Sequence, residues 1–136
     1  EMRGADSGRW RRICALRAFW VGLLSDDAAR DAAWALVKDF SLAERHALRD
    51  GVPRLALHLP FRGGSVRDLA RRALEISREG LRRRAALNGD GQDETRFLDV
   101  LQEIVDSGKT AAERKLDLFH GAWNGSVDPV FREFAY

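Results

Sequence analysis

Signals that start an α-helix recur along this chain, and each precedes apolar residues at helical spacing. Ser41 with Glu44, and Thr110 with Glu113, match the capping box, in which the two side chains satisfy each other's free backbone amides. Ser65 precedes another apolar stripe and is expected to be the N-cap of a long helix. This alternation of caps and stripes predicts a mainly helical chain.

The bounds of the predicted helices follow from the caps and the stripes. An apolar run at 13–24 gives the first helix, and Ser25 is expected to cap a second that runs to about Phe40. A third, short helix should stop between Asp50 and Pro53, because proline cannot donate the hydrogen bond that continues it. Further helices are expected at 66–87, 97–105, 111–123 and 130–134.

Some local expectations are specific enough to check. Residues 55–61 alternate loosely, but Pro60 argues against a central strand, so we expect a connecting loop. Gly80 interrupts the long helix at a cost of about 1 kcal/mol relative to alanine, which indicates close packing or a small bend. Leu116 and Trp123 are expected to face inward.

The first residues of the chain follow a different pattern. Glu1, Met2 and Arg3 alternate charged and apolar side chains, as in a strand with one buried face, and turn residues follow at 4–8. Side chains two apart on a strand point the same way, so Glu1 and Arg3 can serve one site. A single strand needs partners for its edges, and none is evident in the remaining sequence, so we expect those partners upstream.

Two interpretations of this pair remain open on spacing alone. A carboxylate suits Mg2+, and a guanidinium suits phosphate oxygens, so Glu1 and Arg3 together fit a metal-nucleotide or acyl-phosphate centre. The alternative is an ion pair on a solvated sheet face, which the charged alternation by itself favours.

Composition excludes several classes of protein. The chain has 136 residues, of which 45% are hydrophobic, as in one soluble domain. A net charge of +2 does not imply a nucleic-acid partner, and no apolar run approaches the length of a membrane span. Because no leader is in view either, we expect a cytoplasmic protein.

Other candidate motifs are weak. Gly63 and Gly64 precede a helix but lack the spacing of a phosphate-binding loop, and residues 88–94 lack the closing glutamate of a calcium loop. The arginines at 82–84 fit a solvated helix end, although one of them reaching a nucleotide remains an alternative. Cys14 is the only cysteine and is by default a small buried apolar residue.

Long composite motifs of this chain resemble one family. Residues 1–24, EMRGADSGRWRRICALRAFWVGLL, are similar to a late core strand and the following helix of glutamate-cysteine ligases of the plant and proteobacterial type. Where that family more usually has glycine, proline, proline and tyrosine, this chain has Ser7, Arg9, Arg17 and Ser25, which affects the expected loop geometry more than the reaction. Further segments in the family's order are 80–84, 93–98, 103–105, 110–113 and 123–131.

The resemblance implies a fold and a reaction. The fold of the whole enzyme would be α+β, with a glutamine-synthetase-like antiparallel sheet and helices. Residues 1–136 would be the C-terminal portion of its single catalytic domain, mainly helical with one N-terminal strand and inactive without the missing upstream part. The reaction would be ATP-dependent ligation of L-glutamate and L-cysteine through a gamma-glutamyl phosphate, giving gamma-glutamylcysteine for glutathione biosynthesis.

The resemblance also implies roles for individual residues. Arg3 would be the catalytic phosphate contact and Glu1 the Mg2+ ligand. Trp10 and Arg12, expected in the loop after the strand, would wall the substrate pocket, although Trp10 also fits the core. Cys14 is a candidate for redox control. Two other functions remain alternatives: a non-catalytic helical interaction module, and a related carboxylate-amine ligase that uses another amine.

Overall fold

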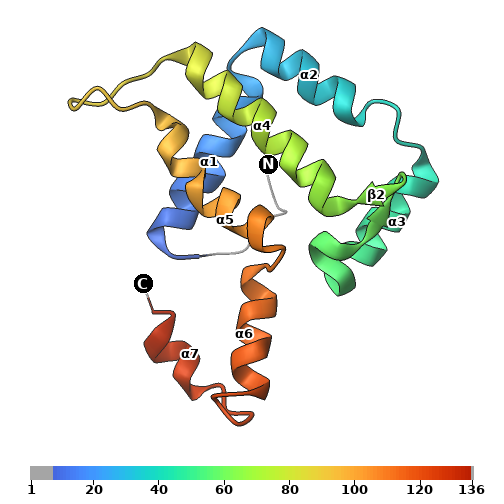
Figure 1. Ribbon diagram of the computed structural model, residues 1–136, viewed down its shortest axis with the longest axis vertical. Coiled ribbons are helices and arrows are strands. Elements are labelled where there is room, and N and C mark those ends of the chain that lie inside the picture. Colours follow the sequence, from blue (N-terminus) through green and yellow to red (C-terminus); the bar gives the residue numbers. More distant parts are fainter. Residues whose placement is uncertain (1–7, 136) are drawn as a thin grey trace.

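The computed structural model describes residues 8–135, and they form a mainly helical chain with one short hairpin (Figure 1). The predicted mainly helical character is confirmed, whereas the strand expected at Glu1–Arg3 lies outside the described residues. In chain order the elements are α1 (Trp10–Leu24), α2 (Asp27–Val37), α3 (Leu42–Leu55), η1 (Ala56–His58), β1 (Pro60–Phe61), β2 (Gly64–Ser65), α4 (Val66–Arg84), η2 (Glu94–Leu98), α5 (Asp99–Ser107), α6 (Ala111–His120) and α7 (Asp128–Glu133).

The centre of the fold is the crossing of α1 and α4 (Figure 1). A Cβ atom added at Gly80 would lie 1.9 Å from the carbonyl oxygen of Gly22, and one added at Gly22 would lie 2.2 Å from that of Ser77. The buried Ser77 hydroxyl donates to the Phe19 carbonyl at 2.9 Å. The two backbones therefore touch, with only the small Ser77 side chain beside the contact, which confirms close packing at Gly80.

Apolar side chains close the space on either side of this crossing. Two clusters form, both with residues from α1 and α4, so a single core spans the helices around the crossing. One consists of Ala18, Leu74, Leu81, Leu98 and Val105, and the other of Leu23, Ala29 and Ile76.

Predicted caps are present at the N-terminal ends of α3, α4 and α6. The capping boxes at α3 and α6 are present, and the Asp68 carboxylate accepts from the Ser65 amide at 2.9 Å. At α2 the cap is Asp26, whose carboxylate accepts from the Ala29 amide at 2.8 Å, and not Ser25. The Ser25 hydroxyl instead donates back to the Val21 carbonyl, because α1 continues until that point.

Residues 55–61 do not form the predicted loop. The helix α3 continues through Pro53 to Leu55. Pro53 has no N–H to donate to the backbone carbonyl one turn earlier, but this part of α3 is exposed, so water can satisfy that carbonyl. Antiparallel pairing then joins Pro60 to Ser65 and Phe61 to Gly64. Positive φ angles at the two intervening turn residues permit this tight hairpin, and Pro60 is tolerated because a two-stranded sheet consists of edges only.

An arginine in the hairpin turn fixes it to α3. The Arg62 guanidinium donates to a Glu44 carboxylate oxygen at 2.9 Å and lies 4.7 Å from the centre of the Phe40 ring. The pKa of Glu44 falls from 4.5 to about 2. The hydrogen bond from Arg62 is the largest cause, and the hydrogen bond from the backbone amide of Ser41 is the second. A charged stack therefore stabilises this hairpin in place of a buried core.

The helices α3, α6 and α7, which we call the outlying helices, contain no buried residue (Figure 1). Leu116 is 54% exposed, so its predicted inward orientation is wrong, because α6 extends away from the α1–α4 crossing. Trp123, after α6, is buried as predicted, and its indole N–H donates to the Glu133 carboxylate at 3.1 Å. Within residues 8–135, no helix has the length and apolar character that crossing a membrane requires.

Candidate functional site

The structure places only part of the predicted site. Glu1 and Arg3 lie outside the described residues, so their roles stay predictions. Trp10 and Arg12 lie in the first turn of α1 and not in a loop, because the helix begins three residues before the apolar run at 13–24. Trp10 is 75% exposed, which excludes a core position in this chain. Cys14 follows one turn later and is half-buried.

The N-terminal end of α1 has an unusual charge distribution. Its first turn contains no acidic residue, and no side chain of residues 8–135 caps it. Arginines stand at 9, 11 and 12 instead, although the positive end of a helix dipole disfavours cations. Free amides and guanidinium groups together attract anions, so this end of α1 can hold a carboxylate or a phosphate.

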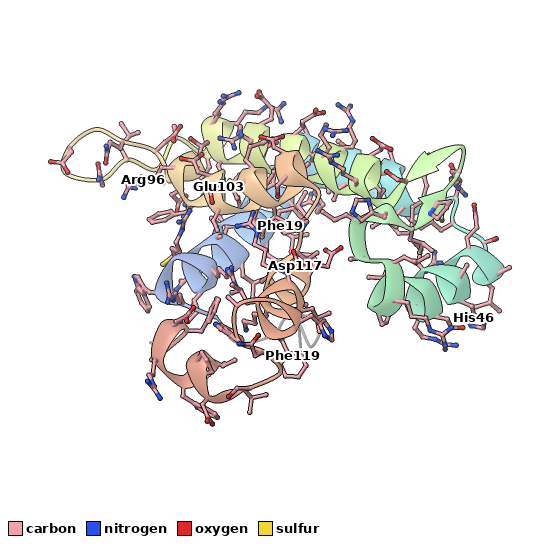
Figure 2. All side chains as sticks on the ribbon, turned by 60° about the horizontal axis from the view of Figure 1, so that its bottom comes forward. Phe19, His46, Arg96, Glu103, Asp117 and Phe119 are labelled. Carbon is pink, nitrogen blue, oxygen red and sulfur yellow. The ribbon has the colours of Figure 1, made fainter. Side chains whose placement is uncertain are left out.

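The three arginines point in different directions. Arg9 donates to the Glu133 carbonyl and lies 5.4 Å from the centre of the Phe134 ring, which joins it to the C-terminal end of the chain. Arg11 forms an ion pair at 2.9 Å with Glu103 of α5, the residue labelled in Figure 2. Both groups therefore have structural partners.

Arg12 differs from its neighbours. Its stem lies close to the backbone of Gly8, where an added Cβ atom would be 3.2 Å from the Arg12 Cδ. No carboxylate of residues 8–135 lies within ion-pair distance of its guanidinium. Within residues 8–135, Arg12 is the one of these three arginines whose guanidinium has neither a hydrogen bond nor an ion pair.

Arg12 lines an open cavity of about 300 Å³ between α1, η1, α4 and α5, which we call the Arg12 cavity. Its walls are otherwise apolar, so the guanidinium is the only charged group among them. An aliphatic chain that carries an anionic group matches this combination. Sequence reasoning selected Arg12 but missed the other walls, among them Leu16, Phe19, Leu57, Leu101 and Ile104. The apolar stripes of α1 and α5 could have indicated them.

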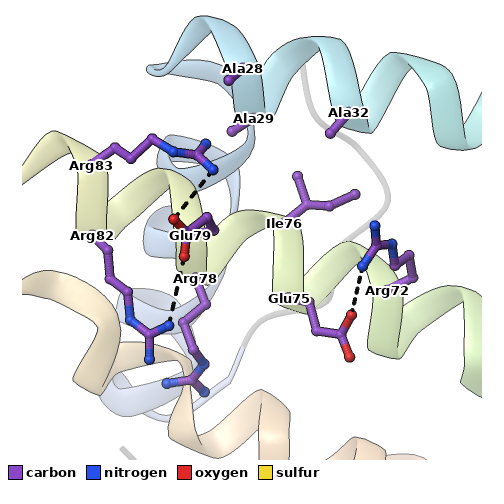
Figure 3. Close-up of a pocket in the computed structure, with 10 residues that line it drawn as sticks. All are labelled: Ala28, Ala29, Ala32, Arg72, Glu75, Ile76, Arg78, Glu79, Arg82 and Arg83. Carbon is purple, nitrogen blue, oxygen red and sulfur yellow. Dashed lines mark hydrogen bonds and ion pairs between the residues drawn. The ribbon is translucent and has the colours of Figure 1, made fainter.

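A second pocket, of about 360 Å³, lies between α2 and α4 and contains several arginines (Figure 3). Arg72 pairs with Glu75 at 3.1 Å, and Arg83 pairs with Glu79 at 3.3 Å. Arg83 also reaches Asp26 at 2.9 Å. Arg78 pairs with Asp99 and Arg82 with Glu79, each at 3.7 Å. Since every arginine of this pocket has a carboxylate partner, the pocket fits the predicted solvated end of α4 better than an anion site.

Residues 8–135 contain no group of three or more His, Cys, Asp or Glu side chains placed to hold a metal ion. The predicted Mg2+ ligand, Glu1, lies before this range. Its assignment therefore depends on the sequence resemblance alone.

Comparison with known proteins gives a consistent result. A sequence model described as Glutamate-cysteine ligase family 2 matches residues 1–133. The chloroplastic glutamate-cysteine ligases of Nicotiana tabacum and Arabidopsis thaliana are 46% and 47% identical to this chain over all 136 residues. Chloroplastic glutamate-cysteine ligase B of Oryza sativa subsp. japonica is 48% identical over the same length.

The alignments cover all of this chain but only a part of each relative. The alignments span 100% of this chain but only 25% to 26% of each relative. The relatives are named chloroplastic, which contradicts the expected cytoplasmic location. Because the family model matches nearly the whole sequence, this chain belongs to glutamate-cysteine ligase family 2.

Proposed function

We propose that this chain is the C-terminal portion of the catalytic domain of an ATP-dependent glutamate-cysteine ligase. The enzyme would join L-glutamate to L-cysteine through a gamma-glutamyl phosphate, the first step of glutathione biosynthesis. The observation that carries the proposal is the family match over residues 1–133. The relatives bear the name of this activity, and each is about four times as long as the matched region.

The proposed fold follows the same reasoning. A strand at Glu1–Arg3 would join a glutamine-synthetase-like antiparallel sheet whose other strands belong to the rest of the enzyme. The helices described here would lie beside that sheet. Since a strand without partners leaves its edges unpaired, the chain alone should be inactive.

The charges near the start of α1 support a site for anionic substrates. Acyl-phosphate formation needs positive charge around the transferred phosphoryl group, and Arg3 would supply it there. ATP and Mg2+ would supply the activated phosphoryl group and further charge neutralisation, with Glu1 holding the ion. Arg12 and the free amides of α1 would bind a substrate carboxylate, and the exposed Trp10 ring would cover it.

Substitutions in the complete enzyme test the first pair. Arg3→Ala should lower turnover about a hundredfold, as the loss of one preorganised electrostatic contact usually does. Glu1→Gln should raise the Mg2+ concentration required for half-maximal activity. Near-normal turnover and Mg2+ dependence in both variants would remove these assignments.

A second comparison tests the end of α1. Arg12→Ala should raise the KM for glutamate about tenfold or more, because a charge-assisted hydrogen bond to a carboxylate is lost. The matched control is Arg17→Ala, on the same helix and exposed. Equal KM values for the two variants would exclude Arg12 from the glutamate site.

The acceptor needs its own assay. The complete enzyme, supplied with ATP, glutamate and a panel of amines, should consume ATP with cysteine at the highest kcat/KM. A higher value with another amine would support the related carboxylate-amine ligase instead. Absence of ATP turnover with every amine would support the helical interaction module.

A further inference from the structure

An apolar groove of about 460 Å³ lies between α1, α2 and α4. It is distinct from the Arg12 cavity because residues of α2 form part of its walls. Large side chains in it remain exposed: Trp34 is 62% exposed, Leu24 52% and Val37 37%. The residues that define this apolar groove are Trp20, Leu24, Trp34, Leu36, Val37 and Leu69.

The composition of the apolar groove indicates the chemistry of its occupant. Among the residues that the structure describes, Arg30 is the only charged one in its walls. A nucleotide or an amino acid would leave its charges there without partners, at a large desolvation cost. Exposed tryptophan and aliphatic side chains that adjoin one another are typical of a surface that packs against other protein.

The length of the relatives indicates which protein that is. All 136 residues align with only 25% to 26% of each relative, so about three quarters of each relative has no counterpart in this chain. We propose that the apolar groove is the surface on which the remaining portion of the same enzyme packs, through an apolar segment of its own. This rests on family membership and not on the proposed ligation chemistry.

The helix α2 offers a matched pair of positions for a test. Val37 lines the apolar groove. Ala35 is exposed and lies on the polar side of α2, together with Asp31, four residues earlier, and Lys38, three residues later. A cysteine at either position changes the side chain little. In this chain by itself, both positions face solvent.

The test measures thiol accessibility in the complete enzyme. Val37→Cys and Ala35→Cys variants are treated with iodoacetamide, and the modification of each site is followed by peptide mass mapping. We expect the cysteine at 37 to react at least tenfold more slowly than that at 35 in the native enzyme, and at the same rate after denaturation. Equal native rates would show an open groove and overturn the proposal.

Two further results decide between occupants. Protection at 37 that disappears on dilution would mean that a second copy covers the groove, and it would also overturn the proposal. Trp34→Asp should lower the melting temperature of the complete enzyme more than Ala35→Asp does, since only the first places a charge in the interface. Because neither readout uses catalysis, failure here leaves the proposed ligase function untouched.

Discussion

The helices around the α1–α4 crossing and the outlying helices are stabilised in different ways. At the crossing, glycine backbones touch and buried side chains such as Leu81 and Leu98 fill the space between elements. The outlying helices bury none of their residues. Of these, α3 and α6 depend on the Ser41 and Thr110 capping boxes and on ion pairs such as that of Glu44 with Arg62. The comparison shows that local signals can define a helix that buries none of its residues in the described part of the chain.

The largest expected effect is at the crossing itself. Gly80→Val should destabilise the protein by about 3 kcal/mol or more, because the new side chain would overlap the Gly22 carbonyl and neither backbone can withdraw. Chemical denaturation of the purified protein measures this. Gly89→Ala is the control, since an added Cβ there meets nothing within 4 Å.

A pair of leucine substitutions compares the two regions directly. Leu98→Ala should cost about 2 to 5 kcal/mol, because it leaves a cavity in the core. Leu116→Ala, on α6, should change stability by no more than about 0.5 kcal/mol in this chain. A cost above 2 kcal/mol for Leu116→Ala in the complete enzyme would mean that the rest of the enzyme covers α6.

Removal of a cap should affect an outlying helix alone. Thr110→Ala deletes the hydroxyl that accepts from the Glu113 amide, at a cost of about 1 kcal/mol. Hydrogen exchange should therefore accelerate in α6 and remain unchanged in α4. Faster exchange in both helices would show that α6 and the core unfold together.

The smallest expected effect depends on pH. Because the pKa of Glu44 falls from 4.5 to about 2 in the folded protein, its ionised form adds stability above about pH 4.5. That contribution is lost as the pH falls toward 2. The difference in melting temperature between the protein and its Glu44→Gln variant should be constant above pH 5 and shrink below it. A difference that does not vary with pH would contradict this linkage.

Much of the helical fold could be predicted because its signals are local. The capping boxes at Ser41 and Thr110 and the C-terminal Gly108, with a φ of 69°, act within a few residues. The hairpin at 60–65 could not be predicted, since it depends on positive φ angles at Arg62 and Gly63 and on contacts with α3. The orientation of Leu116 also depends on where other elements lie.

The candidate site was predictable only in part, and for a related reason. Motif order indicated Trp10 and Arg12, but the absence of a cap at the start of α1 concealed that both lie on a helix. The walls of the Arg12 cavity come from elements distant in sequence, such as Leu57 and Ile104. Long-range packing of this kind leaves no pattern in the residues near Arg12.

The contact between Gly22 and Gly80 also constrains motion. Because the two backbones are in direct contact, with only the Ser77 side chain beside them, α1 cannot slide or rotate against α4 without steric overlap. Trp10 and Arg12, at the far end of the same continuous helix, are thus held at a fixed distance from this crossing. Any closure that accompanies substrate binding should come from segments that approach this end of α1, while α1 itself stays still.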